Sequence, residues 1–162
     1  MKRKRKIYLD TSVISHLDAP DVPDKMADTW RLWQLFEQDS EFEPVISVIT
    51  QAEILQCPEP KREQMVQWLK SLNCEIFDET REVLELANEY INRGILSPKH
   101  FDDILHIAHA VTKHCECIAS WNFKHIVNLK TIDGVSAANI ILGYPSIKIV
   151  SPTMLIQGED DE

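Results

Sequence analysis

Hydrophobic residues along the chain form short apolar runs that alternate with longer amphipathic stretches. The short runs predict β-strands over residues 6–9, 44–48, 74–77, 117–120 and 147–150. Apolar residues at helical spacing, with glycines and prolines that end helices, predict helices over residues 24–36, 49–56, 61–72, 80–93, 101–113 and 133–142. A further helix is expected to begin at Asp10, directly after the first strand.

Strands that alternate with helices are typical of a mainly parallel sheet covered by helices on both faces. The sequence therefore predicts an α/β fold, a three-layer α/β/α sandwich with a central sheet of about five strands. In such sheets, functional sites form at the carboxyl ends of the strands.

The length of 162 residues suits one domain with a real hydrophobic core. Residues 1–162 are expected to form a single domain, with a short basic N-terminus at residues 1–5 and an acidic tail at residues 158–162. The net charge of −9 argues against broad electrostatic attraction to nucleic acid. If the chain binds RNA, metal ions and a local basic patch must offset this charge.

No apolar run approaches the roughly 18 residues of a membrane span. The basic start lacks the roughly 7–15 apolar residues of a signal peptide, so a cytoplasmic protein is expected. The four cysteines, Cys57, Cys74, Cys115 and Cys117, are then interpreted as reduced thiols. The His-Cys-Glu-Cys run at residues 114–117 has no second half that would complete a structural zinc site.

Two acidic residues follow predicted strands. Asp10 stands at the carboxyl end of the first strand, where an aspartate is also a favoured helix N-cap. Glu53 comes shortly after the second strand and three residues after Thr50, which is the spacing of a capping box. The motifs alone leave both interpretations, cap and metal ligand, open for each residue.

Helical geometry separates the adjacent residues Asp102 and Asp103. At about 100° per residue, Asp102 shares a polar stripe with His106 and His109, whereas Asp103 points toward the apolar side. A carboxylate at the margin of a core must be paired, hydrogen-bonded or bound to metal. Asp103 is therefore the candidate, Asp102 is expected to be solvated, and the two histidines are interpreted as residues of the polar face.

Asn122 follows the fourth strand, where it is either a helix cap or part of a site. With Asp10, Glu53 and Asp103 it could bring three carboxylates and an amide to one cleft. Converging carboxylates repel one another and are rarely tolerated without a cation. Their oxygens suit Mg²⁺ or Mn²⁺ rather than zinc, and such ions orient phosphodiesters and activate water, which favours a nuclease.

Four segments resemble the motifs of the PIN-domain family. Residues 9–15 (Leu-Asp-Thr-Ser-Val-Ile-Ser) resemble its first acidic motif and residues 49–55 (Ile-Thr-Gln-Ala-Glu-Ile-Leu) its second. Residues 103–108 (Asp-Ile-Leu-His-Ile-Ala) are similar to the third motif, and residues 120–126 (Ser-Trp-Asn-Phe-Lys-His-Ile) to a Trp-Asn variant of the fourth. The motifs occur in the order of the family and span nearly the whole chain.

The resemblance implies a metal-dependent endoribonuclease that hydrolyses RNA phosphodiester bonds with Mg²⁺ or Mn²⁺. It implies that the metal-binding and catalytic residues are Asp10, Glu53, Asp103 and Asn122. Many members have an aspartate at the position of Asn122, and an amide supplies no negative charge to the metal. The residues expected to assist or to contact the substrate are Ser12, Lys124 and His125.

A resemblance to VapC-like toxins further implies the toxin of a type II toxin–antitoxin pair, with a small antitoxin protein as partner and a homodimeric assembly. One alternative is a PIN fold with a weakened site that serves as a protein-interaction module. A second is a metal-free ribonuclease that uses His106 and His125 as acid and base and survives EDTA. A P-loop enzyme is excluded, because the chain has no Gly-x-x-x-x-Gly-Lys-Ser/Thr sequence.

Overall fold

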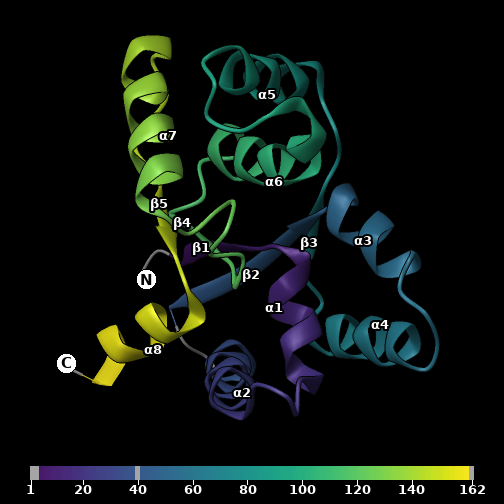
Figure 1. Cartoon of the computed structure of the whole chain (residues 1–162). Coiled ribbons are helices and arrows are strands. Elements are labelled where there is room, and N and C mark those ends of the chain that lie inside the picture. Colours follow the sequence, from purple (N-terminus) through teal and green to yellow (C-terminus); the bar gives the residue numbers. More distant parts are fainter. Residues whose placement is uncertain (1–3, 39–40, 161–162) are drawn as a thin grey trace.

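The five predicted strands form one sheet in the computed structural model, which describes residues 4–38 and 41–160 (Figure 1). The strands are β1 (Arg5–Leu9), β2 (Phe42–Ser47), β3 (Glu75–Phe77), β4 (Cys117–Ala119) and β5 (Lys148–Val150). Their order is β3-β2-β1-β4-β5, and every neighbouring pair is parallel.

Helices cover both faces of this sheet. They are α1 (Thr11–Ser15), α2 (Pro23–Glu37), α3 (Val48–Leu55), α4 (Lys61–Leu72), α5 (Arg81–Asn92), α6 (Phe101–Thr112), α7 (Leu129–Leu142) and α8 (Pro152–Asp160), with short 3-10 turns η1 (His16–Asp18) and η2 (Pro98–His100). In Figure 1, α5, α6 and α7 lie on one side of the sheet and α1, α2, α4 and α8 on the other. This arrangement confirms the predicted three-layer α/β/α sandwich.

Side chains of the central strand alternate between two hydrophobic cores. Ile7 and Leu9 pack in the core with residues of α1, α2, α4 and α8, whereas Tyr8 packs in the core with residues of α5, α6 and α7. Successive side chains of a strand point to opposite faces, so a strand with three consecutive apolar residues (Ile7 to Leu9) needs cover on both faces. The uninterrupted apolar run therefore requires the two helical layers.

Several boundaries differ from the prediction. The predicted helix over 133–142 begins earlier, at Leu129, because Asn128 caps it. Helix α8 was not predicted, and it includes residues 158–160 of the predicted acidic tail. Arg5 of the predicted basic N-terminus belongs to β1 and makes ion pairs with Glu41 and Glu116 at 3.3 and 2.6 Å. Residues 1–3 and 161–162 lie outside the described part.

The interpretation of α6 as an amphipathic helix with a polar histidine stripe is wrong. Every residue from Ile104 to Thr112 is buried, including His106 at 2% and His109 at 0% exposure. The helix lies under α5 and also contacts α3 and β4, so it has no solvated side beyond its first turn. The predicted difference within that first turn is confirmed, since Asp102 is exposed and Asp103 only partly so.

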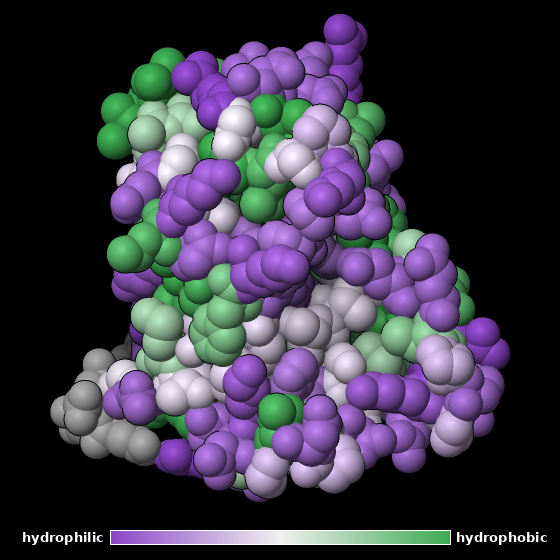
Figure 2. All heavy atoms as spheres, viewed as in Figure 1, coloured by the Kyte–Doolittle hydropathy of each residue, from purple (hydrophilic) through white to green (hydrophobic). Residues whose placement is uncertain are grey.

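The outer surface is mostly hydrophilic on the face that Figure 2 shows. Hydrophobic side chains gather on it over α7, at the upper left. Within α7, Ile140 and Ile141 are 78% and 68% exposed. In the described part of the chain, no helix has the length and apolar character needed to cross a membrane.

The strand order defines where a site can form. The chain leaves β1 toward β2 on one side, and β4 lies on the other side of β1, so the strand order reverses between β1 and β4. Because the strands are parallel, their carboxyl ends share one edge of the sheet, and ligands bind at such a reversal. Asp10, Ser47 and Ser120, which lie at or just beyond the ends of β1, β2 and β4, meet at this edge.

Asn128 connects the loop after β4 to the start of α7. Its Oδ1 accepts a hydrogen bond from the Thr131 amide at 2.9 Å, and its Nδ2 donates to the carbonyl groups of Phe123 and Lys124 at 3.1 and 3.0 Å.

Asn128→Ala should lower the free energy of unfolding by about 1–2 kcal/mol, the upper range for loss of a cap. Asn128→Asp keeps the acceptor and loses only the donors, so its loss should be smaller. Urea denaturation of both variants measures this, and equal losses would contradict the assigned roles.

Candidate functional site

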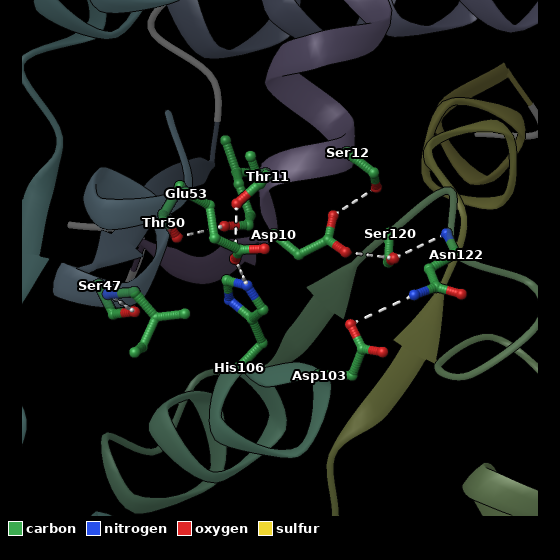
Figure 3. A network of polar contacts seen from close by, with 12 residues as sticks. Asp10, Thr11, Ser12, Ser47, Thr50, Glu53, Asp103, His106, Ser120 and Asn122 are labelled. Carbon is green, nitrogen blue, oxygen red and sulfur yellow. Dashed lines mark hydrogen bonds and ion pairs between the residues drawn. The ribbon is translucent and has the colours of Figure 1, made fainter. Parts of the chain in front are cut away.

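Asp10 places a buried carboxylate at the carboxyl end of β1. It is 4% exposed, and its two oxygens accept hydrogen bonds from the Ser12 and Ser120 hydroxyls at 2.5 and 2.7 Å (Figure 3). Asp10 occupies the N-cap position of α1, but its side chain accepts no helix amide. The carboxylate is therefore free to serve a site rather than the helix end.

Burial raises the pKa of Asp10 above its ordinary value, and the nearby charge of Glu53 adds to this effect. The charge of His106 and the hydrogen bonds from Ser12 and Ser120 act in the opposite direction. A second cation beside Asp10 would stabilise its ionised form further.

Glu53, on α3, faces the same region. Its carboxylate accepts a hydrogen bond from the Thr11 hydroxyl at 2.9 Å and pairs with His106 Nε2. The N-cap of α3 is Ser47, whose hydroxyl accepts from the Ile49 amide, so the capping-box interpretation of Glu53 is wrong. Burial opposes ionisation of Glu53, but the hydrogen bond and charge of His106 outweigh it and lower the pKa of Glu53.

His106 connects Glu53 to buried hydroxyl groups of the core. Its Nε2 faces Glu53, and its Nδ1 lies 2.7 Å from the Tyr8 hydroxyl, which in turn lies 2.6 Å from the Ser47 hydroxyl. Burial disfavours the protonated ring, yet the hydrogen bond to Glu53 and the charges of Asp10, Glu53 and Asp103 raise the pKa of His106. The sequence analysis missed this role because it assigned His106 to a solvated stripe.

Asp103 joins the network from the first turn of α6. Its Oδ1 accepts from Asn122 Nδ2 at 3.3 Å, and its Oδ2 lies 3.0 Å from His125 Nδ1. The backbone N–H of Asn122 donates a hydrogen bond to the Ser120 hydroxyl, and that hydroxyl donates to the carboxylate of Asp10. A continuous chain of contacts therefore runs from Asp10 through Ser120 and Asn122 to Asp103 (Figure 3).

The oxygen of Asn122 has a different partner. Oδ1 accepts the His125 amide hydrogen at 2.9 Å and so closes the turn after β4. With the amide in this orientation, the residue presents a hydrogen-bond donor to Asp103 and directs its potential ligand atom toward the backbone. Asn122 thus stabilises the local turn and contacts Asp103, whereas the N-cap of α7 is Asn128.

The carboxylates are near one another but do not form one tight group. Among the described residues, one set of three or more His, Cys, Asp or Glu ligand atoms lies within 4.8 Å of one another, and it comprises His100, Asp103 and His125. Asp10, Glu53 and Asp103 are not such a set. They are connected instead by hydrogen-bonded groups and by the electrostatic effects that shift the pKa of Asp10 and His106.

Ser12 and an aromatic rim lie beside Asp10. The Ser12 hydroxyl accepts the Trp121 amide hydrogen at 2.9 Å while it donates to Asp10, so it fixes the loop after β4 against α1. Lys25 Nζ lies 5.5 and 5.0 Å from the ring centres of Trp121 and Phe123, and Phe123 is 45% exposed. Lys124, in the same loop, is exposed.

Comparison with known proteins supports the fold. No family model matches the chain, and no curated protein matches it in sequence. A similar solved structure is VapBC2 from Rickettsia felis, bound to a DNA fragment from their promoter: the TM-score is 0.54 and the identity 17%, over 74% of this chain and 89% of that chain. The fold is PIN-like. The candidate site lies at the carboxyl edge of the parallel sheet in this fold.

The raised pKa of His106 predicts a pH-dependent contribution to stability. The folded state favours the protonated form of His106. The resulting contribution to the free energy of unfolding is complete below the ordinary pKa of 6.5 and is lost as pH rises through the raised pKa. The pKa of Glu53 is lowered, so the contribution of its ionised form to the free energy of unfolding is present above pH 4.5. This contribution is lost as pH falls through the lowered pKa. His106→Gln should therefore destabilise the metal-free protein more at a pH of about 5.5 than at about 9, by about 1.4 kcal/mol for each unit of the pKa shift.

Denaturation curves of His106→Gln and the unmodified protein in EDTA at both pH values measure this difference. Tyr8→Phe is the matched control, since it removes the hydroxyl bonded to His106 Nδ1 but no charge. Its effect should vary much less with pH. A loss of stability for His106→Gln that is the same at both pH values would show that His106 is neutral in the folded protein.

Proposed function

We propose that this chain is a metal-dependent endoribonuclease that hydrolyses RNA phosphodiester bonds. The observation that supports this most is the buried carboxylate of Asp10 at the carboxyl edge of a parallel sheet, joined by hydrogen bonds to Asp103 and electrostatically coupled to Glu53. Ligand sites of parallel sheets form at this edge. Neighbouring carboxylates of which one is buried are best stabilised by a cation, and the PIN-like fold is compatible with this chemistry.

The donor set fits Mg²⁺ or Mn²⁺. Asp10, Glu53 and Asp103 would hold the ion, because hard divalent cations prefer carboxylate oxygens. Mg²⁺ keeps several waters and needs only one or two direct carboxylates, so oxygens spread over more than 4.8 Å are suitable. Each oxygen of Asp10 accepts one hydroxyl hydrogen bond and retains a lone pair for a further partner.

The chain's own residues orient and stabilise this site. When bound, the ion would polarise a phosphodiester and activate a water for attack. Ser12 and Ser120 hold the carboxylate of Asp10 in one orientation, and His106 does the same for Glu53. Asn122 holds Asp103 through its amide group. Such fixed orientations favour the reaction because the carboxylates need not reorganise when charge develops on the substrate.

The substrate would approach along the loop after β4. Lys124 is exposed there and His125 is partly exposed, so both are suitable contacts for phosphate oxygens. The exposed ring of Phe123 is suitable for stacking on an unpaired base. These local features would offset the net charge of −9, which repels RNA at long range.

The biological role in this proposal is that of the toxin in a type II toxin–antitoxin pair in the cytoplasm. The similarity to a solved VapBC2 structure is the support for this context. A small antitoxin protein and a second copy of the chain are the partners that the proposal includes. Co-expression with the product of a neighbouring small reading frame, followed by measurement of the molecular mass of the complex, tests both partners.

A specific observation favours a second candidate function, a protein-interaction module with a weakened site. Asn122 supplies no charge, and its oxygen already accepts the His125 amide hydrogen.

A metal-free ribonuclease that uses His106 and His125 is not supported, because His106 is 2% exposed and both its ring nitrogens have partners within the fold. Cleavage of a mixed RNA pool with Mn²⁺, with Mg²⁺ and with EDTA separates the three functions. The nuclease stops in EDTA, the histidine enzyme continues, and the interaction module never cleaves.

Asp103→Ala should abolish this metal-dependent cleavage, with a loss of about 100-fold or more, because several kcal/mol of transition-state stabilisation depend on the metal. Asp102→Ala is the matched control, since Asp102 is exposed on the same helical turn and should retain most activity. Initial rates with Mn²⁺ give the comparison. Similar rates for the two variants would remove Asp103 from the proposed centre.

Asn122→Asp should tighten binding of Mg²⁺ or Mn²⁺. One carboxylate oxygen can keep the contact with the His125 amide, while the other replaces Nδ2 beside Asp103 and adds a negative charge. The gain in metal-binding free energy should be on the order of 1 kcal/mol, for an effective dielectric constant near 20. The metal-free variant should also be less stable, because two carboxylates then face each other.

Calorimetric titration with Mn²⁺ measures the affinity of Asn122→Asp, and denaturation in EDTA measures its stability. Unchanged values in both measurements would limit Asn122 to its role in the turn. Tighter binding with unchanged cleavage would make the residue a metal contact that has no part in the slowest step.

A further inference from the structure

Three side chains form a second cluster, which shares one residue, Asp103, with the carboxylate network. His100 ends η2, Asp103 lies in the first turn of α6, and His125 lies in the loop after β4. One ligand atom from each lies within 4.8 Å of those of the other two. No other such group of three occurs among the residues that the structure describes. The cluster is partly exposed, so an ion can reach it from solvent.

The distances in the cluster match those between ligands of one ion. His125 Nδ1 and Asp103 Oδ2 are 3.0 Å apart, and the rings of His100 and His125 have centroids 3.8 Å apart with an interplanar angle of 34°. Bonds of about 2.0–2.1 Å from zinc to nitrogen or oxygen place two tetrahedral ligands about 3.3 Å apart. The distance between Asp103 and His125 is close to this value, and a ligand atom of His100 lies within 4.8 Å of theirs.

The ligand types differ from those of the carboxylate network. Two imidazoles and one carboxylate are typical of zinc and other first-row transition metals, whereas Mg²⁺ prefers oxygen alone. We propose that His100, Asp103 and His125 form a binding site for a divalent transition-metal ion of the zinc class. Three protein ligands leave a position open for water or for an oxygen of a bound anion.

Asp103 lies between this site and the carboxylate network. Its Oδ2 faces the histidines, while its Oδ1 accepts from Asn122. Three of the four cysteines are poor competitors for the ion, because burial raises the pKa of the Cys74, Cys115 and Cys117 thiols to about 12. An ion bound by the cluster would tie η2, α6 and the loop after β4 together and stabilise the folded chain. The proposal does not depend on the nuclease function.

Zinc titration of the EDTA-treated full chain, by calorimetry and by thermal denaturation, tests the site. We expect one zinc ion for each chain, a raised Tm, and binding that survives millimolar Mg²⁺. His100→Gln and His125→Gln should each weaken zinc binding by about 100-fold or more, since even partners of metal ligands contribute about 10–100-fold. Both variants keep Asp103, and circular dichroism verifies that they fold.

His114→Asn is the matched control, because it removes an exposed histidine from outside the cluster. His114 has a positive φ of 57°, which asparagine also tolerates, so zinc affinity and fold should be unchanged. Co²⁺ in place of zinc gives a second readout, a visible spectrum without a thiolate band. Zinc affinity that is the same in His100→Gln and His125→Gln as in the unmodified chain, no saturable binding, or a thiolate band would each overturn the proposal.

Discussion

Asp10 places a carboxylate where water has almost no access, at the end of the central strand of a parallel sheet. A charge in such a position is costly unless hydrogen bonds and opposite charges surround it. The compensation comes from three separate elements, since Ser12 belongs to α1, Ser120 follows β4 and His106 belongs to α6. One buried carboxylate therefore connects these three elements at the end of β1.

Protonated His106 and a bound divalent cation would both offset the negative charge of the carboxylates. Without metal, the raised pKa of His106 and the lowered pKa of Glu53 describe an ion pair that offsets part of the negative charge near Asp10. A cation added at the carboxylates lowers the benefit of the proton on His106, because like charges repel. Binding of such a cation would therefore be thermodynamically linked to protonation of His106.

The alternation of apolar runs was sufficient to predict the sheet, because buried parallel strands and covering helices have different periodicities. Position at strand ends was likewise sufficient to predict that Asp10 and Asn122 lie together. His106 could not be found in this way. Its partners, Glu53 and Tyr8, are 53 and 98 residues away in sequence, and α6 is buried on all sides, so helical periodicity carries no information about which face is solvated. Tertiary packing, rather than local pattern, turned an apparent surface histidine into the centre of the network.

The amide of Asn122 explains how Asp103 is accommodated beside the other carboxylates at this edge. A carboxylate at this position would repel Asp103, whereas Nδ2 binds Asp103 and Oδ1 binds the turn. The negative charges are then divided into two groups, each with its own imidazoles. Asp10 and Glu53 lie with His106, and Asp103 lies with His125 and His100. Because the groups differ in ligand chemistry, the two proposed sites would offer oxygen ligands for a hard cation beside nitrogen ligands for a softer one at the same edge of the sheet.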